Sequence, residues 1–164
     1  MKQLLVIRHA KSSWDYSVLN DFDRPLNERG HHDAMMMASR LLESNITIDA
    51  FISSSANRAF TTATYFAEIF GEKENCIIKV PELYHAPAAV IYNVISKIDG
   101  AFNTIAIFSH NPGITEFVNE LTDRQLDNMP TCGIFAVKAN INHWKLFASS
   151  KKEFLFFDFP KHSS

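Results

Sequence analysis

Residues 104–114, TIAIFSHNPGI, contain the features that decide the fold. The apolar run 104–108 is the strongest strand signal in the chain. Asn111 and Pro112 follow it and are residue types that begin helices, so we expect a helix from there to about Leu121. A buried strand that leads directly into a helix is the repeating unit of α/β proteins.

The same alternation of strand and helix recurs earlier in the chain. Asn57 is the expected N-cap of one of these helices, and Gly71 is its expected stop. The pattern predicts an α/β three-layer sandwich with a mostly parallel central sheet and helices on both faces. The expected strands, each with the helix that follows it, are 3–7 with 31–44, 49–54 with 58–70, and 76–80 with 88–98.

The C-terminal third has a different pattern. Residues 133–139 and 144–148 are strand-like, and we expect them to form a closing β-hairpin across 140–143. The hydrophobic tail 153–159 alternates poorly, which leaves three roles open for it: an edge strand, a dimer contact or a lid over the core.

Composition limits the class of protein. The 164 residues suit one domain, 1–164, and a net charge of −2 gives no strong attraction to nucleic acid. No apolar run approaches the roughly 20 residues of a membrane span, and the N-terminus lacks the apolar core of a signal peptide. Two cysteines, Cys76 and Cys132, lie in apolar runs and are expected to be buried thiols. We therefore expect a cytoplasmic protein; the sequence does not predict its oligomeric state.

Unusual side chains follow three of the expected strands. Arg8 and His9 come after the first, Arg58 comes shortly after the second, and His110 comes after the fourth. Carboxyl ends of parallel strands meet at one edge of the sheet, where ligands of such folds bind. We therefore expect two arginines, two histidines and two helix N-termini to converge there.

This combination suits a phosphate dianion. Arginine presents a fixed fork of donors, and helix N-termini present free N–H groups. A neutral imidazole also attacks phosphorus, which indicates phosphoryl transfer through a phosphohistidine, with no metal or cofactor. Each residue alone equally suits a surface charge or a helix cap. We do not expect a metal at His31, His32 and Asp33, because adjacent helix positions do not face one site.

Four segments carry a resemblance to a known family. They are RHAKSSW at 8–14, DRPLNERG at 23–30, SSSANRAFTTA at 53–63 and FSHNPGI at 108–114. In this order and spacing they resemble the histidine phosphatase superfamily, whose fold is phosphoglycerate mutase-like. The short chain resembles its SixA branch, the phosphohistidine phosphatases.

The resemblance implies a role for each matching residue. His9 would be the nucleophile, Arg8 and Arg58 would clamp the phosphoryl oxygens, and His110 would donate a hydrogen bond to the same group. Arg24 would shape or charge the entrance. The chain departs from the family pattern at Ala10, where glycine is usual, and at Ser55-Ala56, where Ser-Pro is usual.

The general acid is the third departure. Glu82 in PELYHA stands where larger members of the family carry an acidic residue, and it equally suits a solvated loop carboxylate. We expect the loops 10–30 and 82–90 to set the specificity.

Three functions remain open at this stage. The first is a metal-independent phosphatase that acts on phosphohistidine in a protein. The second is a phosphatase of small phosphomonoesters such as sugar phosphates or nucleotides. The third is a catalytically inactive phosphate-binding module, which the presence of both His9 and Arg58 disfavours.

Overall fold

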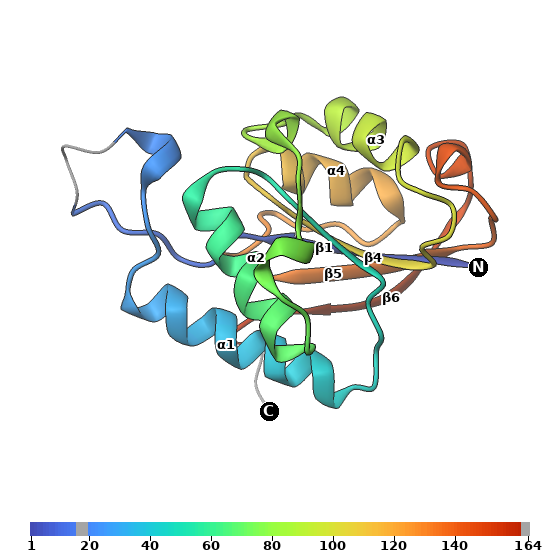
Figure 1. Ribbon diagram of the computed structural model, residues 1–164. Coiled ribbons are helices and arrows are strands. Elements are labelled where there is room, and N and C mark those ends of the chain that lie inside the picture. Colours follow the sequence, from blue (N-terminus) through green and yellow to red (C-terminus); the bar gives the residue numbers. More distant parts are fainter. Residues whose placement is uncertain (16–19, 162–164) are drawn as a thin grey trace.

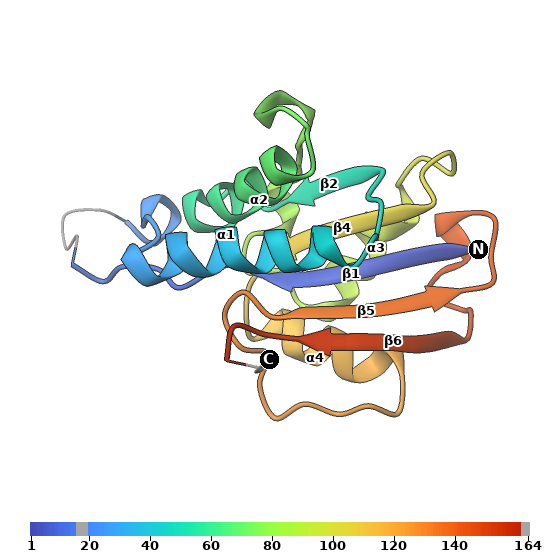
Figure 2. The same ribbon diagram turned by 90° about the horizontal axis from the view of Figure 1, so that it is seen from below.

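The computed structural model describes residues 1–15 and 20–161. It consists of a central sheet with two helices on each face (Figures 1 and 2). Within the described residues, four single-turn 3₁₀ helices lie in the connections: η1 Asp21–Asp23, η2 Glu74–Cys76, η3 Pro81–Leu83 and η4 Trp144–Leu146. The other elements are β1 Lys2–Arg8, α1 Glu28–Glu43, β2 Ala50–Ser53, α2 Asn57–Ile69, β3 Ile78–Lys79, α3 Ala88–Ser96, β4 Thr104–Ser109, α4 Gly113–Leu121, β5 Ile134–Ala139 and β6 Lys152–Asp158.

The sheet has the strand order β3-β2-β4-β1-β5-β6. Strands β3, β2, β4 and β1 are parallel, whereas β5 runs antiparallel to both of its neighbours. The predicted α/β sandwich with a mostly parallel sheet and helices on both faces is confirmed. Because β2, β4 and β1 are adjacent, their carboxyl ends lie together at one edge.

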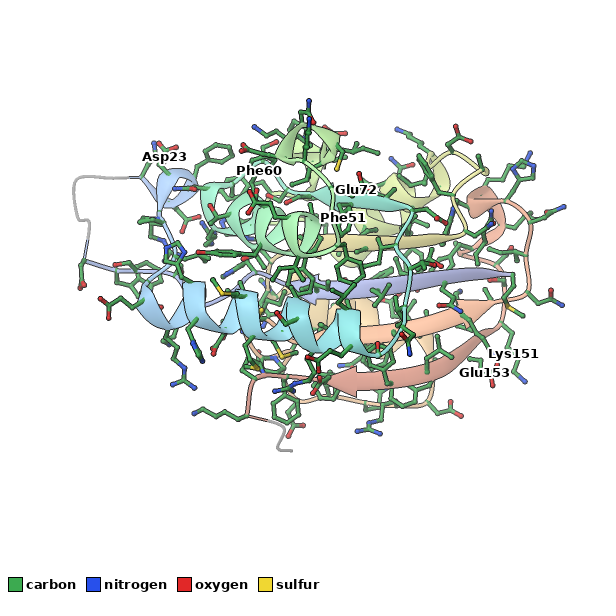
Figure 3. All side chains as sticks on the ribbon, turned by 60° about the horizontal axis from the view of Figure 1, so that its bottom comes forward. Asp23, Phe51, Phe60, Glu72, Lys151 and Glu153 are labelled. Carbon is green, nitrogen blue, oxygen red and sulfur yellow. The ribbon has the colours of Figure 1, made fainter. Side chains whose placement is uncertain are left out.

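Successive residues of a strand point to opposite faces, and this divides the core into two layers. In β1, Leu4 and Val6 pack in the layer that α3 and α4 cover, while Leu5 and Ile7 pack in the layer that α1 and α2 cover. Phe51 of β2 belongs to the second layer (Figure 3). Burial on both faces explains why the central strands are continuous apolar runs in the sequence.

The C-terminal prediction was partly wrong. Residues 144–146 form η4, with Trp144 buried, and the strand that pairs with β5 is β6. The tail 153–159 therefore contributes the edge strand of the sheet, one of its three expected roles. Apart from the exposed Glu153, its side chains are half-buried on both faces of the strand, which agrees with the poor alternation of the sequence.

Two smaller expectations were also wrong. The run 76–80 contributes only the two-residue β3, and Cys76 is exposed, whereas Cys132 is buried as expected. Ala56 occupies the N-cap of α2, so Asn57 is its first helical residue; Gly71 follows the helix with a positive φ, as predicted. No helix among residues 1–15 and 20–161 is long and apolar enough to cross a membrane.

Candidate active site

The two predicted histidines meet at the carboxyl edge of the sheet. His9 follows β1 and His110 follows β4, and their ring centroids are 5.2 Å apart. Pairing of the parent strands continues past their ends, because the amide of His9 donates to the carbonyl oxygen of Ser109 at 3.2 Å. Both side chains are buried. The register between β1 and β4 brings these two histidines, which are about a hundred residues apart in the sequence, into one cluster.

The two predicted arginines flank this pair. Arg58 lies in the first turn of α2 and is fully buried; its Nη1 donates to the carbonyl oxygen of Asp21 at 2.7 Å. The Nη1 of Arg8 donates to the carbonyl oxygen of Met129 at 2.9 Å. Burial lowers the pKa of Arg8, and the nearby cation of Arg58 lowers it further. Two guanidinium groups that repel one another gain stability from an anion between them.

Unsatisfied polar atoms mark the same cluster. Within the described residues, three buried side-chain nitrogens lack a hydrogen-bond partner: Nε of Arg8, Nε of Arg58 and Nδ1 of His110. Leaving a buried donor unsatisfied costs about 1–3 kcal/mol, so proteins rarely accumulate such atoms without a reason. All three belong to residues that the sequence predicts to hold a phosphoryl group. The arrangement is therefore a preformed set of donors for an oxyanion.

His9 is held as a neutral imidazole with one defined free nitrogen. Its Nδ1 lies 2.7 Å from the carbonyl oxygen of Ala10, and because a carbonyl only accepts, the ring proton is on Nδ1. Burial lowers the pKa of His9 to about 3; the bond to Ala10 opposes this shift, and the cations of Arg58 and Arg8 add to it. The lone pair at Nε2 is consequently available at neutral pH.

His110 is also neutral, and Ser54 sets its orientation. The Nε2 of His110 lies 2.8 Å from the Oγ of Ser54, which itself accepts the amide of Ala56 at 3.2 Å. Burial lowers the pKa of His110 to about 2, and His9 and Arg58 add to the shift. If the hydroxyl of Ser54 donates to Nε2, the ring proton of His110 lies on the unsatisfied Nδ1, where it can be donated to an oxyanion.

Thr62 joins the loop after β1 to helix α2. Its Oγ1 accepts the amide of Ala10 at 2.9 Å and donates to the carbonyl oxygen of Arg58 at 2.8 Å. The positive φ angles of non-glycine residues in the described chain fall elsewhere, so the methyl group of Ala10 causes no backbone strain. The departure from glycine at Ala10 is therefore accommodated, and one hydroxyl couples the predicted nucleophile to the predicted clamp.

Three residues that the sequence did not single out form the mouth of the cluster. The Oδ2 of Asp21 in η1 accepts hydrogen bonds from Arg58 Nη2 at 3.0 Å, from Tyr84 Oη at 2.6 Å and from His85 Nε2 at 2.9 Å. Burial alone would raise the pKa of Asp21, but these bonds, Tyr84 first, hold it below the ordinary value. The rings of Tyr84 and His85 lie 5.5 Å and 5.3 Å from that of His110.

The loops expected to set the specificity, 10–30 and 82–90, thus meet at Asp21, although residues 16–19 of the first loop lie outside the described residues. Arg24 braces that loop: its Nε bonds Asp21 at 3.1 Å, its Nη1 bonds Ser12 at 2.6 Å, and its guanidinium lies 3.6 Å from the centre of the Trp14 ring.

Glu82, the predicted acid, is exposed in η3, and none of the contacts described for the chain links it to His9 or His110. Its role stays a prediction. Among the described residues, no group of three or more His, Cys, Asp or Glu side chains is placed to hold a metal ion. That the reaction needs no metal or cofactor also stays a prediction.

A sequence comparison identifies the family. Residues 4–84 match the model of the histidine phosphatase superfamily, branch 1. An uncharacterised chloroplastic protein of Arabidopsis thaliana is 30% identical over 152 residues, which cover 88% of this chain and 69% of the relative. The chain belongs to the histidine phosphatase superfamily, which confirms the predicted family and assigns the protein to the phosphatases of that group.

Other similarities are partial in sequence or concern the fold. A 2,3-bisphosphoglycerate-dependent phosphoglycerate mutase of Gloeothece citriformis is 37% identical over 104 residues, which cover 61% of this chain but only 43% of the mutase. The protein histidine phosphatase SixA, solved with tungstate, superposes with a TM-score of 0.81 at 20% identity, over 96% of this chain and 97% of SixA. A mycobacterial glucosyl-3-phosphoglycerate phosphatase, solved with VO₃, gives 0.71 at 15% identity, over 95% and 98%. At these identities the two structures show the fold.

Proposed function

We propose that the protein is a phosphatase that works through a covalent phosphohistidine at His9. The observation that carries this proposal is the set of unsatisfied buried donors on Arg8, Arg58 and His110 beside a neutral imidazole. A site that only bound phosphate would need the donors but not a nucleophile with a free Nε2. The two features together support transfer of the phosphoryl group.

The reaction has two steps. In the first, Nε2 of His9 attacks phosphorus, the bond to the leaving group breaks, and the donors of Arg8, Arg58 and His110 stabilise the phosphoryl oxygens. In the second, water attacks the phosphorus of phospho-His9, and the electron pair of the N–P bond returns to Nε2. The clamp serves both steps because the phosphoryl group moves little between them.

The substrate that we propose is phosphohistidine in a protein. The likeness to SixA supports it. Small phosphomonoesters are the second candidate, favoured by the sequence relationship to the mutase.

The test compares two substrates in the presence of EDTA: a protein that carries phosphohistidine and a simple phosphomonoester. Preferential phosphate release from the protein supports the proposal, and preference for the ester transfers the assignment to the second candidate. His9→Ala is expected to abolish release from both while partly retaining the binding of tungstate, measured by calorimetry. Substantial turnover by His9→Ala would contradict the covalent mechanism, and strong inhibition by EDTA would indicate a metal.

A phosphate-binding module is the outcome if neither substrate is turned over. In that case the wild type still binds tungstate, and the Arg58→Met variant binds tungstate more weakly. This result separates loss of the proposed activity from misfolding, because an unfolded chain would bind no oxyanion.

A further inference from the structure

The proposed reaction needs a proton donor for the leaving group, and the mouth of the site contains an imidazole paired with a carboxylate. The Nε2 of His85 lies 2.9 Å from Oδ2 of Asp21, and its ring centroid lies 5.3 Å from that of His110. Half of the His85 side chain is exposed, so it faces both the cluster and solvent. The mouth therefore holds a titratable ring against a fixed anion.

The backbone holds His85 in this place at a cost. Its φ is 52°, in the left-handed region that few residues other than glycine adopt. Such strain persists only where the surroundings over-determine the conformation, and it concentrates at functional sites. Two contacts hold the segment: Oγ of Ser109 donates to the carbonyl oxygen of Leu83 at 2.9 Å, and Gly113 of α4 packs directly on the carbonyl oxygen of Ala86.

Asp21 gives the pair its chemistry. Its carboxylate remains charged because Tyr84, His85 and Arg58 all donate to it. Because a carboxylate only accepts, Nε2 of His85 carries a proton toward Oδ2 of Asp21, and this bond fixes the orientation of the ring. Two other titratable rings face His85. Burial raises the pKa of Tyr84, whose ring centroid lies 4.2 Å away, and burial lowers the pKa of His110, so that both stay neutral.

We propose that His85 is the general acid of the proposed reaction and that Asp21 is its positioning residue; this inference rests on the proposed function. As the bond from phosphorus to the leaving atom breaks, that atom keeps the electron pair and takes a proton from the His85 imidazolium. In the second step neutral His85 accepts the proton that the attacking water loses, which regenerates the imidazolium. This assignment replaces Glu82, which the sequence suggested.

The test varies the leaving group. A general acid matters most when the leaving group is poor, so the substrates are p-nitrophenyl phosphate, phenyl phosphate and an alkyl phosphate. The value of kcat/KM is measured, because it reports the step in which the leaving group departs. The variant is His85→Asn, since asparagine tolerates a positive φ, and Glu82→Gln is the matched control from the same loop.

For His85→Asn we expect kcat/KM to fall about 10²-fold or more with phenyl and alkyl phosphate, and only a few-fold with p-nitrophenyl phosphate. Glu82→Gln should change none of the three by more than a few-fold. An equal fall with all three esters would show a structural role for His85 and overturn the proposal, as would a selective loss in Glu82→Gln. If the wild type turns over the phosphohistidine protein but no ester, the same variants are compared on that protein, and an unchanged kcat/KM in His85→Asn would overturn the proposal. If the wild type turns over neither, the proposed function itself has failed.

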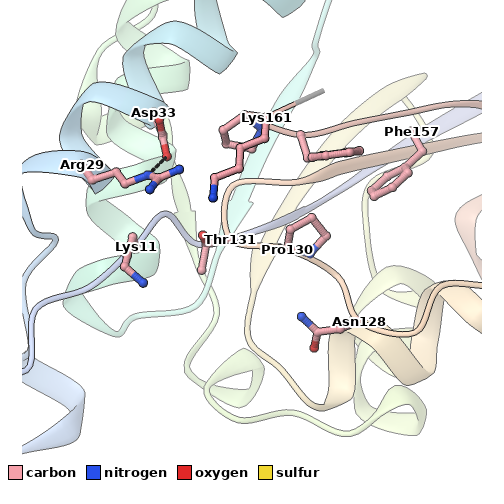
Figure 4. Close-up of a pocket in the computed structure, with 10 residues that line it drawn as sticks. Lys11, Arg29, Asp33, Asn128, Pro130, Thr131, Phe157 and Lys161 are labelled. Atoms are coloured by element: carbon pink, nitrogen blue, oxygen red, sulfur yellow. Dashed lines mark ion pairs between the residues drawn. The ribbon is translucent and has the colours of Figure 1, made fainter. Parts of the chain in front are cut away.

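A second observation stands apart from the dyad. A cavity of about 450 Å³ lies between the N-terminal part of α1, the loop after β1, the segment 128–131 and the residues that follow β6 (Figure 4). Neighbours of the lining segment bond to the clamp: the carbonyl oxygen of Met129 accepts from Nη1 of Arg8, and the amide of Cys132 donates to the carbonyl oxygens of Arg8 and His9 at 3.0 and 3.1 Å. Lys11, which lines the cavity, follows His9 by two residues.

The lining is cationic on one side and apolar on the other. Lys11, Arg29 and Lys161 come from three segments and stand around the same space, while Pro130 and Phe157 form the opposite wall (Figure 4). Asp33 is the acidic residue of the lining, and its Oδ2 lies 3.5 Å from Nε of Arg29. The lining has more cationic than acidic side chains, so the cavity carries a positive charge, whereas the whole chain has a net charge of −2.

We infer that this cavity receives an acidic side chain of the substrate protein, close in sequence to the phosphorylated residue. A carboxylate complements the ammonium groups of Lys11 and Lys161, and its aliphatic stem suits the proline and phenylalanine wall. The cavity would thus select among phosphohistidine proteins, an inference that rests on the proposed function.

The test uses two phosphohistidine peptides that differ only in glutamate or glutamine beside the phosphorylated residue. We expect the wild type to favour the glutamate peptide by about tenfold in kcat/KM, and Lys11→Met and Lys161→Met each to remove most of this preference. Lys97→Met, at the C-terminal end of α3, is the matched control and should retain it. An unchanged preference in both cavity variants would overturn the inference.

A binding measurement keeps this test independent of turnover. The unphosphorylated glutamate peptide should bind His9→Ala more tightly than the glutamine peptide does, and Lys11→Met made in that background should remove the difference. If the peptides bind in this way but are not hydrolysed, the cavity assignment stands and the proposed activity fails. If a small carboxylated phosphate ester shows the Lys11 dependence and the peptides do not, the ligand is a small molecule and the inference is wrong.

Discussion

The clamp and the mouth of the site are built on different physical principles. The clamp consists of Arg8, His9, Arg58 and His110, which end a strand, directly follow one or lie in the first turn of a helix, and whose side chains are largely buried. The mouth consists of Asp21, Tyr84 and His85, which lie in connections and contact solvent. Positions in the clamp follow from strand register, whereas those in the mouth depend on hydrogen bonds between side chains of separate loops. The clamp should therefore govern whether the reaction occurs, and the mouth should govern its rate with particular substrates.

The largest effect is expected in the clamp. Arg58→Lys keeps the charge but loses the forked donors, and it also leaves Asp21 without its Nη2 partner. We expect kcat/KM to fall about 10²–10³-fold for every substrate, the range seen when one donor to a developing oxyanion is removed. Steady-state kinetics with two esters of different leaving group measure this. A fall confined to the poorer leaving group would place Arg58 functionally with the mouth.

The contact that places the mouth over the clamp is expected to be sensitive to a single methyl group. A Cβ at Gly113 would overlap the carbonyl oxygen of Ala86, and both atoms belong to rigid backbone. We expect Gly113→Ala to lower the free energy of unfolding by about 1–3 kcal/mol, as overpacking commonly does. Urea denaturation measures the change. The matched control is Gly71→Ala, where the added methyl group meets open space and any cost arises from the positive φ alone.

The buried histidines of the clamp should make stability depend on pH. In the unfolded chain each titrates near its ordinary pKa of 6.5, whereas in the folded protein the pKa is about 3 for His9 and about 2 for His110. Below pH 6.5 the unfolded state binds protons that the folded state does not, so stability falls as the pH falls. Each histidine contributes a slope that approaches about 1.4 kcal/mol per pH unit.

Urea unfolding between pH 6.5 and 5 tests this, because the carboxylates remain charged in that window. In His9→Gln, the free energy of unfolding should change less steeply with pH than in the wild type, and the difference in slope should equal the contribution of one histidine. Equal slopes would mean that His9 titrates alike in both states and is accessible to solvent in the folded protein.

The smallest effect is expected from a single hydroxyl of the mouth. Tyr84→Phe removes one of the three donors to Oδ2 of Asp21 and leaves Arg58 and His85 in place. We expect kcat/KM to fall about three- to tenfold, in line with roughly 1 kcal/mol for one hydrogen bond to a charged group that keeps other partners. Ester hydrolysis measures it. A loss as large as that of Arg58→Lys would erase the distinction between clamp and mouth.

Much of the fold and of the clamp could be predicted from the sequence. The buried strands are continuous apolar runs, and the parallel arrangement follows from their alternation with helices. Since ligands bind beyond the carboxyl ends of such strands, the sequence alone groups Arg8, His9, Arg58 and His110, although their chemical roles stay proposals. The cytoplasmic location and the single-domain organisation also remain predictions.

The errors share a physical cause. Residues 144–148 have strand-like composition, but 144–146 form η4, because the position beside β5 is occupied by β6. Cys76 lies in an apolar run that the sheet uses for only two residues. In both cases the structure of the segment depends on whether it pairs at the edge of the sheet. Local composition does not determine this pairing.

By itself the sequence determined the layered α/β architecture, the family and the four residues of the clamp, because each depends on local hydrophobic pattern and on residues adjacent to strand ends. Only the tertiary structure decided that Asp21 lies between Arg58, Tyr84 and His85, that Ser54 orients His110, and that Lys11 shares a cavity with Arg29 and Lys161. Those contacts join loops that are distant in sequence. Their formation depends on how the packed elements orient the loops, which no local pattern specifies.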